Sequence, residues 1–453
     1  MISRRTLMGA VALAPALGPT RAFAKLFSVT PRPVESFTLA NGLEVVVLPS
    51  RRAPIVSQTV IYKAGSADEV VGKTGVAHFL EHMMFKGTGA VGAGEFSRTV
   101  SSHGGRDNAY TTFDVTGYYQ TVSPDRLDLV MRMEADRMAD LRITDKELQP
   151  ERQVVLEERR MRTESSPAAL LEEVVQEKLY GRDQPYGVPV IGYVDDINRL
   201  GVGDLETFYR QHYAPNNAVL IVAGDATPDE VRALAEKSYA PVPRREVGLR
   251  QRPSHGAEDL PQRVARADVR VAEPAWGRTW LAPSYRSGET RHAYALQVLA
   301  RLLGGNETSR LSRALVEESK VALSAWASYS ADSLGLSAFE IGIHPARSAS
   351  LAEVEEAAGR QLGRLLDDGV KADEVERAQN QLLAAAIYGR DSLATGPRVF
   401  ASALGTGSTV ADVQAWPQRI AAVTAAEVVA AARHVWRPDG LVTAELTGTG
   451  GGK

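Results

Sequence analysis

Three absences narrow the possible functions of this 453-residue chain before any motif is considered. The sequence contains no cysteine, which excludes disulfide bonds, thiolate metal ligands and a cysteine nucleophile. Its 52 basic residues face 55 acidic ones, a formal net charge of −3, so no basic excess indicates nucleic-acid binding. No apolar run approaches the ~20 residues of a membrane-spanning helix. The remaining composition, with 44% hydrophobic residues, is that of a globular protein long enough for two or more domains.

The first 24 residues have the order of an export signal. Arg4 and Arg5 precede a short apolar run, and the Ala-Phe-Ala sequence at 22–24 has the small residues of a signal-peptidase site. The paired arginines resemble those of twin-arginine export signals. We therefore predict a signal peptide over residues 1–24 and a periplasmic mature chain without a transmembrane segment.

In the rest of the sequence, the same succession of predicted helices, turns and strands occurs twice. A helix end, a proline turn and an apolar strand at 212–225 recur at 435–448, and an amphipathic helix expected over 143–161 recurs at 370–388. Such a tandem repeat predicts two similar α+β domains, each an α/β sandwich of a mixed, largely antiparallel sheet with helices packed on it. The polar, Pro- and Arg-rich stretch at 241–268 is the predicted linker.

The linker divides the mature chain into an N-terminal domain over residues 25–240 and a C-terminal domain over residues 269–453. In the N-terminal domain, apolar periodicity and turn residues predict the following elements: a hairpin at 37–50, a strand at 55–66, a helix at 75–85, a strand at 107–123, and helices at 126–141 and 145–162.

Residues 75–88, GVAHFLEHMMFKGT, carry the strongest chemical signal. His78 and His82 are four residues apart, so on a helix both imidazoles lie on one face and can bind one metal ion. Glu81 lies close to that face, within reach of a water molecule held there. This His-x-x-Glu-His order is the inverzincin signature. The apolar neighbours predict a buried helix, and buried histidines need the partner that a metal supplies.

A catalytic zinc ion needs three protein ligands and an open position, so a third ligand must come from elsewhere. Glu151 and Glu158 are seven residues apart and share one face of the helix expected over 145–162, whereas Glu157 turns roughly 100° away from Glu158. We predict that Glu158 is the third ligand of one Zn²⁺ per chain. Glu151 is predicted to support the site from behind the ligands, where it accepts a hydrogen bond or orients a ligand.

The second half of the repeat has lost this set of residues. Ala378 and Ala385 stand opposite Glu151 and Glu158, and residues 291–305 are apolar where the two histidines would fall. The C-terminal domain is therefore predicted to be degenerate and to have no metal site.

Three stretches at the right separation resemble the pitrilysin/insulinase family of zinc peptidases: GVAHFLEHMMFKGT, RDNAYTTFDVTGYY and ERQVVLEERRM. The resemblance covers nearly all of residues 30–450. The short two-domain form is similar to bacterial relatives of the mitochondrial processing peptidase β subunit. The family resemblance implies a zinc metalloendopeptidase with the following site residues: zinc ligands His78, His82 and Glu158, general base Glu81, additional acid Glu151, and Asn108 and Ala109 on an edge strand that pairs with substrate.

The resemblance also implies what the C-terminal domain lacks. Many relatives carry a substrate-binding arginine and tyrosine after a Ser-Arg-Leu sequence, which is present here at 309–311. Val316 and Leu323 occupy the two positions, while Arg313 and Tyr329 lie nearby at other spacings. One interpretation is drift, with the nearby residues as substitutes. The interpretation that we favour is a heterodimer, in which a paralogous subunit without the metal site supplies the arginine and tyrosine; a homodimer is the alternative.

Together these observations predict an exported zinc-dependent endopeptidase that hydrolyses short or unfolded peptides with Glu81 as general base. Addition of the peptide as a strand would explain broad sequence tolerance. One alternative is a dedicated precursor-processing peptidase. Another is a non-catalytic scaffold or assembly subunit, which zinc occupancy would distinguish from the enzymes.

Overall fold

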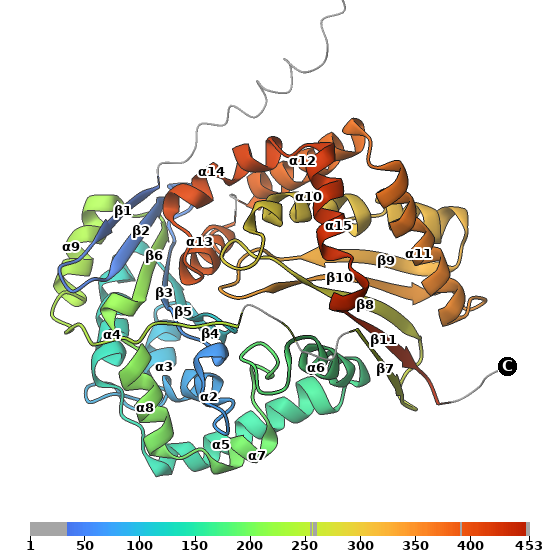
Figure 1. The fold of residues 1–453 in the computed structure, drawn as a ribbon. Coiled ribbons are helices and arrows are strands. Elements are labelled where there is room, and N and C mark those ends of the chain that lie inside the picture. The colour runs from blue at the N-terminus through green and yellow to red at the C-terminus, as the bar shows by residue number, and fades with distance from the viewer. Residues whose placement is uncertain (1–33, 254–255, 257–260, 390–391, 450–453) are drawn as a thin grey trace, which may run out of the picture. The chain divides into compact units, whose positions relative to one another are not determined.

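The structure is a computed structural model that describes residues 34–253, 256, 261–389 and 392–449. The predicted signal peptide at 1–24 lies outside the described residues, as does part of the predicted linker. Two mixed sheets with helices packed on them make up the described chain (Figure 1). Among the described residues, no helix has both the length and the apolar character needed to cross a membrane.

The first sheet has six strands in the order β1-β2-β6-β3-β5-β4. These strands are β1 (Glu35–Thr38), β2 (Glu44–Pro49), β3 (Val56–Tyr62), β4 (Arg106–Thr111), β5 (Thr116–Val122) and β6 (Ala218–Gly224). Strands β2 and β6 are parallel, and the other neighbours are antiparallel. Strand β4 pairs with β5 alone and so forms an edge of the sheet.

The elements β1 to α9 form the first half of the described chain, and β7 to β11 with the helices between them form the second half. The helices of the first half pack on its sheet and carry most of the predicted site residues. They are η1 (Ser66–Asp68), α2 (Val76–Met83), α3 (Glu95–Ser102), η2 (Pro124–Arg126), α4 (Leu127–Asp140), α5 (Asp145–Arg159), η3 (Arg160–Glu164), α6 (Pro167–Tyr180), α7 (Val194–Arg199), α8 (Val202–His212), η4 (Pro215–Asn217) and α9 (Pro228–Ser238). Helix α5 continues directly into η3, which is a π-helix.

The second sheet repeats the order of the first. Its strands follow the order β7-β11-β8-β10-β9, and the pair β7 and β11 is parallel, as β2 and β6 are. The strands are β7 (Gln262–Ala267), β8 (Ala275–Ala282), β9 (Ala322–Tyr329), β10 (Ser337–Pro345) and β11 (Leu441–Thr447). The helices are η5 (Thr290–His292), α10 (Ala293–Gly304), η6 (Ser312–Glu318), α11 (Leu351–Asp368), α12 (Ala372–Gly389), α13 (Thr395–Gly405), α14 (Val410–Ala421), α15 (Ala425–Val435) and η7 (Pro438–Gly440). The predicted fold of two similar α+β domains is confirmed.

One expected element is wrong. The strand predicted over 107–123 is a hairpin of β4 and β5, in which Asn108 lies opposite Tyr119. The chain reverses where the backbone N–H of Thr112 donates to the carbonyl oxygen of Val115 at 2.8 Å, and the Thr112 hydroxyl donates to the same oxygen at 3.0 Å. Residues 112–115 contain neither glycine nor proline, the two strongest turn signals, and Asp114 alone is a weaker one.

Each half places one helix on the sheet of the other half. Helix α6 packs on β7, β8 and β11, whereas α13 packs on β3 and β6 (Figure 1). The second contact forms a separate apolar cluster in which Phe400 and Leu404 of α13 meet Ile61 and Ile221 of the first sheet. The face of each sheet that points away from its own core is therefore covered by a helix of the other half.

A buried acid, Asp114, joins the two halves at the β4–β5 turn. Its carboxylate accepts hydrogen bonds from Tyr186 Oη at 2.7 Å, from Arg252 Nε at 3.0 Å and from the backbone N–H of Leu334 at 3.2 Å. Arg252 also pairs with Asp68 at 2.9 Å. The turn that ends the edge strand β4 is thereby attached to the second half.

We expect Asp114→Asn to destabilise the protein by about 2–4 kcal/mol, because buried donors lose a charged acceptor. The free energy of unfolding measured with urea checks this expectation. The control is Asp125→Asn, which removes an exposed acid of the same half. An Asp114→Asn variant as stable as this control would contradict the role of the buried cluster.

Candidate metal centre

The position of α2 is fixed at its first turn. Gly75 precedes the helix with φ +86°, and a Cβ atom there would lie 2.6 Å from the carbonyl oxygen of Ile191, so a larger residue does not fit. The Glu69 carboxylate accepts hydrogen bonds from the backbone N–H groups of Gly75 at 2.8 Å and Ala77 at 2.9 Å. These bonds satisfy amides that the helix itself leaves free.

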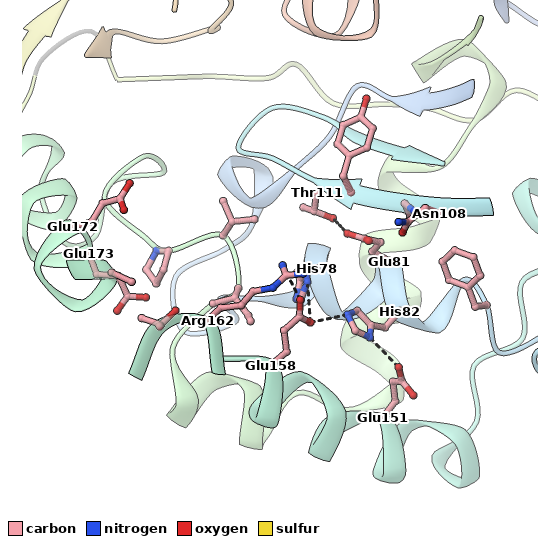
Figure 2. Close-up of a pocket in the computed structure, with 18 of the residues that line it drawn as sticks. His78, Glu81, His82, Asn108, Thr111, Glu151, Glu158, Arg162, Glu172 and Glu173 are labelled. Carbon is pink, nitrogen blue, oxygen red and sulfur yellow. Dashed lines mark hydrogen bonds and ion pairs between the residues drawn. The ribbon is translucent and has the colours of Figure 1, made fainter. Parts of the chain in front are cut away.

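Packing of α2 against α5 brings the three predicted ligands together. Glu158 Oε2 lies 3.2 Å from Nε2 of His82 and 3.6 Å from Nε2 of His78 (Figure 2). All three ligand atoms lie within 4.8 Å of one another, and no other such group of three occurs among the described residues. Glu157, by contrast, points to Arg160 and forms a two-pronged ion pair with it.

The two distances from Glu158 fit a zinc ion. Ligand atoms 2.0–2.2 Å from a tetrahedral zinc ion stand roughly 3.3 Å apart. The two distances from Glu158 Oε2 to the imidazole nitrogens, 3.2 Å and 3.6 Å, bracket this value. Two imidazoles and one carboxylate are also a ligand set of catalytic zinc sites with an open fourth position. The residues present therefore match the metal that the sequence predicts.

Glu151 contacts one of the predicted ligands, His82. Its Oε1 lies 2.8 Å from Nδ1 of His82, and its Oε2 forms an ion pair with Lys86. A proton on Nδ1 then faces Glu151, and the Nε2 lone pair is directed at the ligand cluster. For His78, Nδ1 is buried and has no hydrogen-bond partner among the described residues. The structure thus places Glu151 where the sequence predicts an orienting acid, and it adds Lys86.

The charges of the site favour a cation between the ligands. Burial lowers the pKa of His78, and the nearby His82 lowers it further. Burial opposes the charge of His82 as well, but hydrogen bonds to Glu151 and Glu158 prevail and raise its pKa. The hydrogen bond from His82 is also the main cause of the lowered pKa of Glu158. Two carboxylates thus stabilise positive charge at this point, whether a proton or a metal ion carries it.

Thr111 of β4 holds Glu81 in place. Its hydroxyl donates a hydrogen bond of 2.6 Å to Oε2 of Glu81. Burial raises the pKa of Glu81, and this hydrogen bond opposes the rise. Sequence reasoning missed Thr111, although strand alternation carries a signal: Thr111 is two residues beyond Ala109, so the two side chains share a face of β4.

The candidate centre opens into a cavity of about 750 Å³. Asn108 and Ala109 lie on the edge strand β4 and line it, as do Arg162 of η3 and Glu172 and Glu173 of α6. All of the lining residues that the structure describes fall between positions 78 and 191, so none comes from the second half.

The second-half residues singled out from the sequence lie elsewhere. Val316 packs against the core of the second half, and the side chain of Leu323 is 52% exposed on β9. The hydroxyl of Tyr329 donates to the carbonyl oxygen of Pro283, and Arg313 lies 3.8 Å from Glu318. None of these four side chains lines the cavity.

Comparison with known proteins defines the class to which this fold and site belong. Residues 45–192 match the family model of the insulinase family of peptidases (peptidase family M16), and residues 199–382 match that of the peptidase M16 inactive domain. An uncharacterized zinc protease of Streptomyces coelicolor is 31% identical over 420 residues, which span 89% of this chain and 87% of that protein. The chain belongs to peptidase family M16, which confirms the resemblance of its motifs.

Among the particular relatives, the zinc protease PqqE of Helicobacter pylori is 36% identical over 295 residues, spanning 64% of this chain and 66% of that protein. The crystal structure of a protease from Helicobacter pylori is similar with a TM-score of 0.84 and 28% identity, covering 92% of this chain and 99% of that one. The first half of the periplasmic protease PqqL from Escherichia coli has the same fold, with a TM-score of 0.77 and 19% identity over 91% of this chain and 92% of that one.

Replacing Glu151 by glutamine should weaken zinc binding about 10–100-fold, because His82 loses the charged acceptor that orients it. Competition with a chromophoric chelator measures this affinity without reference to activity. Glu157→Gln is the matched control, since it removes an acid of the same helix that points to Arg160. Equal zinc affinity in the two variants would show that Glu151 does not orient a ligand.

Proposed function

We propose that this protein is a zinc-dependent endopeptidase that hydrolyses short or unfolded peptides. The observation that carries the proposal is the convergence of His78 Nε2, His82 Nε2 and Glu158 Oε2, with Glu81 beside them in an open cavity. The relatives named zinc proteases support the same activity.

The roles of the protein residues follow from their positions. Zinc bound by the three ligands would supply a Lewis acid that lowers the pKa of water and polarises a carbonyl group. Glu81 takes the proton from the attacking water and passes it to the leaving amine. Because burial raises the pKa of this carboxyl group, its carboxylate is a stronger base than an exposed one and is better suited to accept the proton. Thr111 keeps one of its oxygens fixed during this transfer.

The edge strand β4 suits a peptide substrate. It pairs with β5 alone, and Asn108 and Ala109 line the cavity beside Glu81. An added peptide strand would bind through main-chain hydrogen bonds, which carry little sequence information. This mode of binding favours a peptidase of broad specificity. A dedicated precursor-processing peptidase would require side-chain pockets along the same strand and is the alternative.

The proposal includes a second chain. All of the cavity wall that the structure describes comes from the first half, and Val316 and Leu323 stand where relatives carry the substrate-binding arginine and tyrosine. A paralogous subunit without the metal ligands would supply these two groups; a homodimer is the alternative. Because the metal-ligand set is complete in this chain, a purely structural scaffold is the weaker candidate.

Export and domain division complete the proposal. Residues 1–24 would act as a twin-arginine signal that delivers the protein to the periplasm, the compartment named for the relative PqqL. The mature chain would consist of the catalytic domain over 25–240, the linker over 241–268 and the degenerate domain over 269–453.

Replacing Glu81 by glutamine should leave zinc bound and lower kcat about 10²–10⁴-fold, because the isosteric amide cannot accept the proton. The measurement is hydrolysis of a quenched fluorogenic peptide by zinc-loaded protein, with metal content determined for each preparation. Glu157→Gln again serves as the control. Hydrolysis at the wild-type rate by Glu81→Gln would refute the mechanism.

The same assay addresses the second chain. Turnover by the wild-type protein alone that is lost in Glu81→Gln would make the chain self-sufficient and argue for a homodimer. A fully zinc-loaded but inactive wild type would favour the paralogous subunit, and addition of that subunit should restore hydrolysis.

Thr111→Val should lower kcat about 10–100-fold with little change in KM, since a hydrogen bond to a charged group contributes about 1.5–3 kcal/mol. Thr111→Ser keeps the hydroxyl and should retain most of the activity. Steady-state kinetics of both variants test the assignment. It fails if valine and serine behave alike.

A further inference from the structure

Arg162 lines the catalytic cavity, yet the mechanism described above gives it no task. It belongs to the π-helix η3, one turn beyond Glu158 of α5. Its Nη1 lies 2.7 Å from Oε1 of Glu158, and the side chain is 74% exposed (Figure 2). π-helical turns are frequent at functional sites.

The contact places a positive charge directly beside the ligand cluster. Glu158 uses its two oxygens differently: Oε2 faces the two imidazoles, and Oε1 faces Arg162. The guanidinium group is therefore one carboxylate away from the point where the three ligand atoms converge. A peptide carbonyl group that reaches this point also comes close to Arg162.

Arg162 retains donors for such a group. A guanidinium has five N–H donors, and Glu158 is the only ion-pair partner of Arg162 among the described residues. Among the described lining residues, the one other lysine or arginine is Lys86, which is 29% exposed and pairs with Glu151. Of the two, Arg162 has the more exposed side chain.

The neighbouring Arg159 and Arg160 differ from Arg162 in how their guanidinium groups are paired. Arg159 is buried and binds both carboxylate oxygens of Glu173, at 2.8 and 3.0 Å. Arg160 binds both oxygens of Glu157, and neither of these two residues lines the cavity. Both guanidinium groups are thus occupied by a two-pronged ion pair, whereas Arg162 makes a single contact.

We propose that Arg162 is a further catalytic residue, which binds the scissile carbonyl oxygen of the peptide and stabilises the negative charge that develops on it during hydrolysis. This inference rests on the proposed peptidase function. One N–H stays with Glu158, and the remaining donors point to the substrate oxygen. A guanidinium remains protonated throughout, so it contributes charge and hydrogen bonds and transfers no proton. Fixed donors for a developing oxyanion act mainly on kcat.

The kinetic test compares Arg162→Gln, Arg162→Lys and the matched control Arg160→Gln in zinc-loaded full-length protein. For Arg162→Gln we expect kcat to fall about 10²–10³-fold with KM within about threefold of the wild type. Arg162→Lys should recover part of kcat, because lysine keeps the charge and loses the planar fork. Arg160→Gln should match the wild type.

Zinc affinity separates this role from a positioning role through Glu158. Chelator competition should give Arg162→Gln and the wild type the same affinity within about threefold. A loss of kcat that follows the loss of zinc, and that excess zinc restores, would overturn the proposal and leave Arg162 as a residue that only holds Glu158.

A binding measurement keeps the inference separate from the proposed function. In the Glu81→Gln background, which does not turn over, the Kd of the assay peptide is compared with that of its phosphinic analogue, whose charged oxygens mimic the tetrahedral state. Adding Arg162→Gln should weaken the phosphinic analogue at least tenfold and the peptide less than threefold. Equal effects on both ligands, or none, would overturn the proposal, even if the peptidase function holds. Failure of wild-type hydrolysis with selective phosphinic binding would instead count against the proposed function alone.

Discussion

The packing of α2 against α5 is the contact on which the rest of the candidate site depends. It brings Oε2 of Glu158 within 3.6 Å of both imidazole Nε2 atoms, and no single helix could do so. Hydrogen bonds from other parts of the first half hold both ends of α2 in position. Glu69 binds the first backbone amides, and Glu151 holds His82 in the last turn. His78 is buried, and its Nδ1 has no hydrogen-bond partner among the described residues, so a metal ion bound at its Nε2 would stabilise the helix pair.

The β4–β5 hairpin connects this site with the second half. Thr111, the last residue of β4, donates to Glu81, and three residues later Asp114 accepts from Tyr186 and from the backbone of Leu334. One short turn therefore fixes the proposed general base, ends the open edge strand and attaches the second sheet.

The two halves share a sheet topology and differ in what fills the space between their paired helices. In the first half that space holds imidazoles and carboxylates, with cations on the outer carboxylate oxygens. In the second half α10 and α12 meet mainly through apolar residues, with one hydrogen bond from Arg301 Nε to Gln381 Oε1 at 2.8 Å, and Ala378, opposite Glu151 in the repeat, is buried in the core. A buried polar cluster is stable only when every member has a partner, so loss of the metal ligands as a set leaves a simpler apolar core.

The sequence by itself determined the features that depend on local periodicity. The helical repeat of 3.6 residues places His78 beside His82 and Glu151 on the face of Glu158, and the alternation of apolar residues marks most strands. The partners of the site residues were decided by the tertiary structure. Thr111 meets Glu81 only because a turn without glycine or proline reverses the chain after β4. Lys86 reaches Glu151 only because folding brings α5 beside the end of α2, whereas Arg162 lies four residues beyond Glu158, a spacing that the sequence already shows.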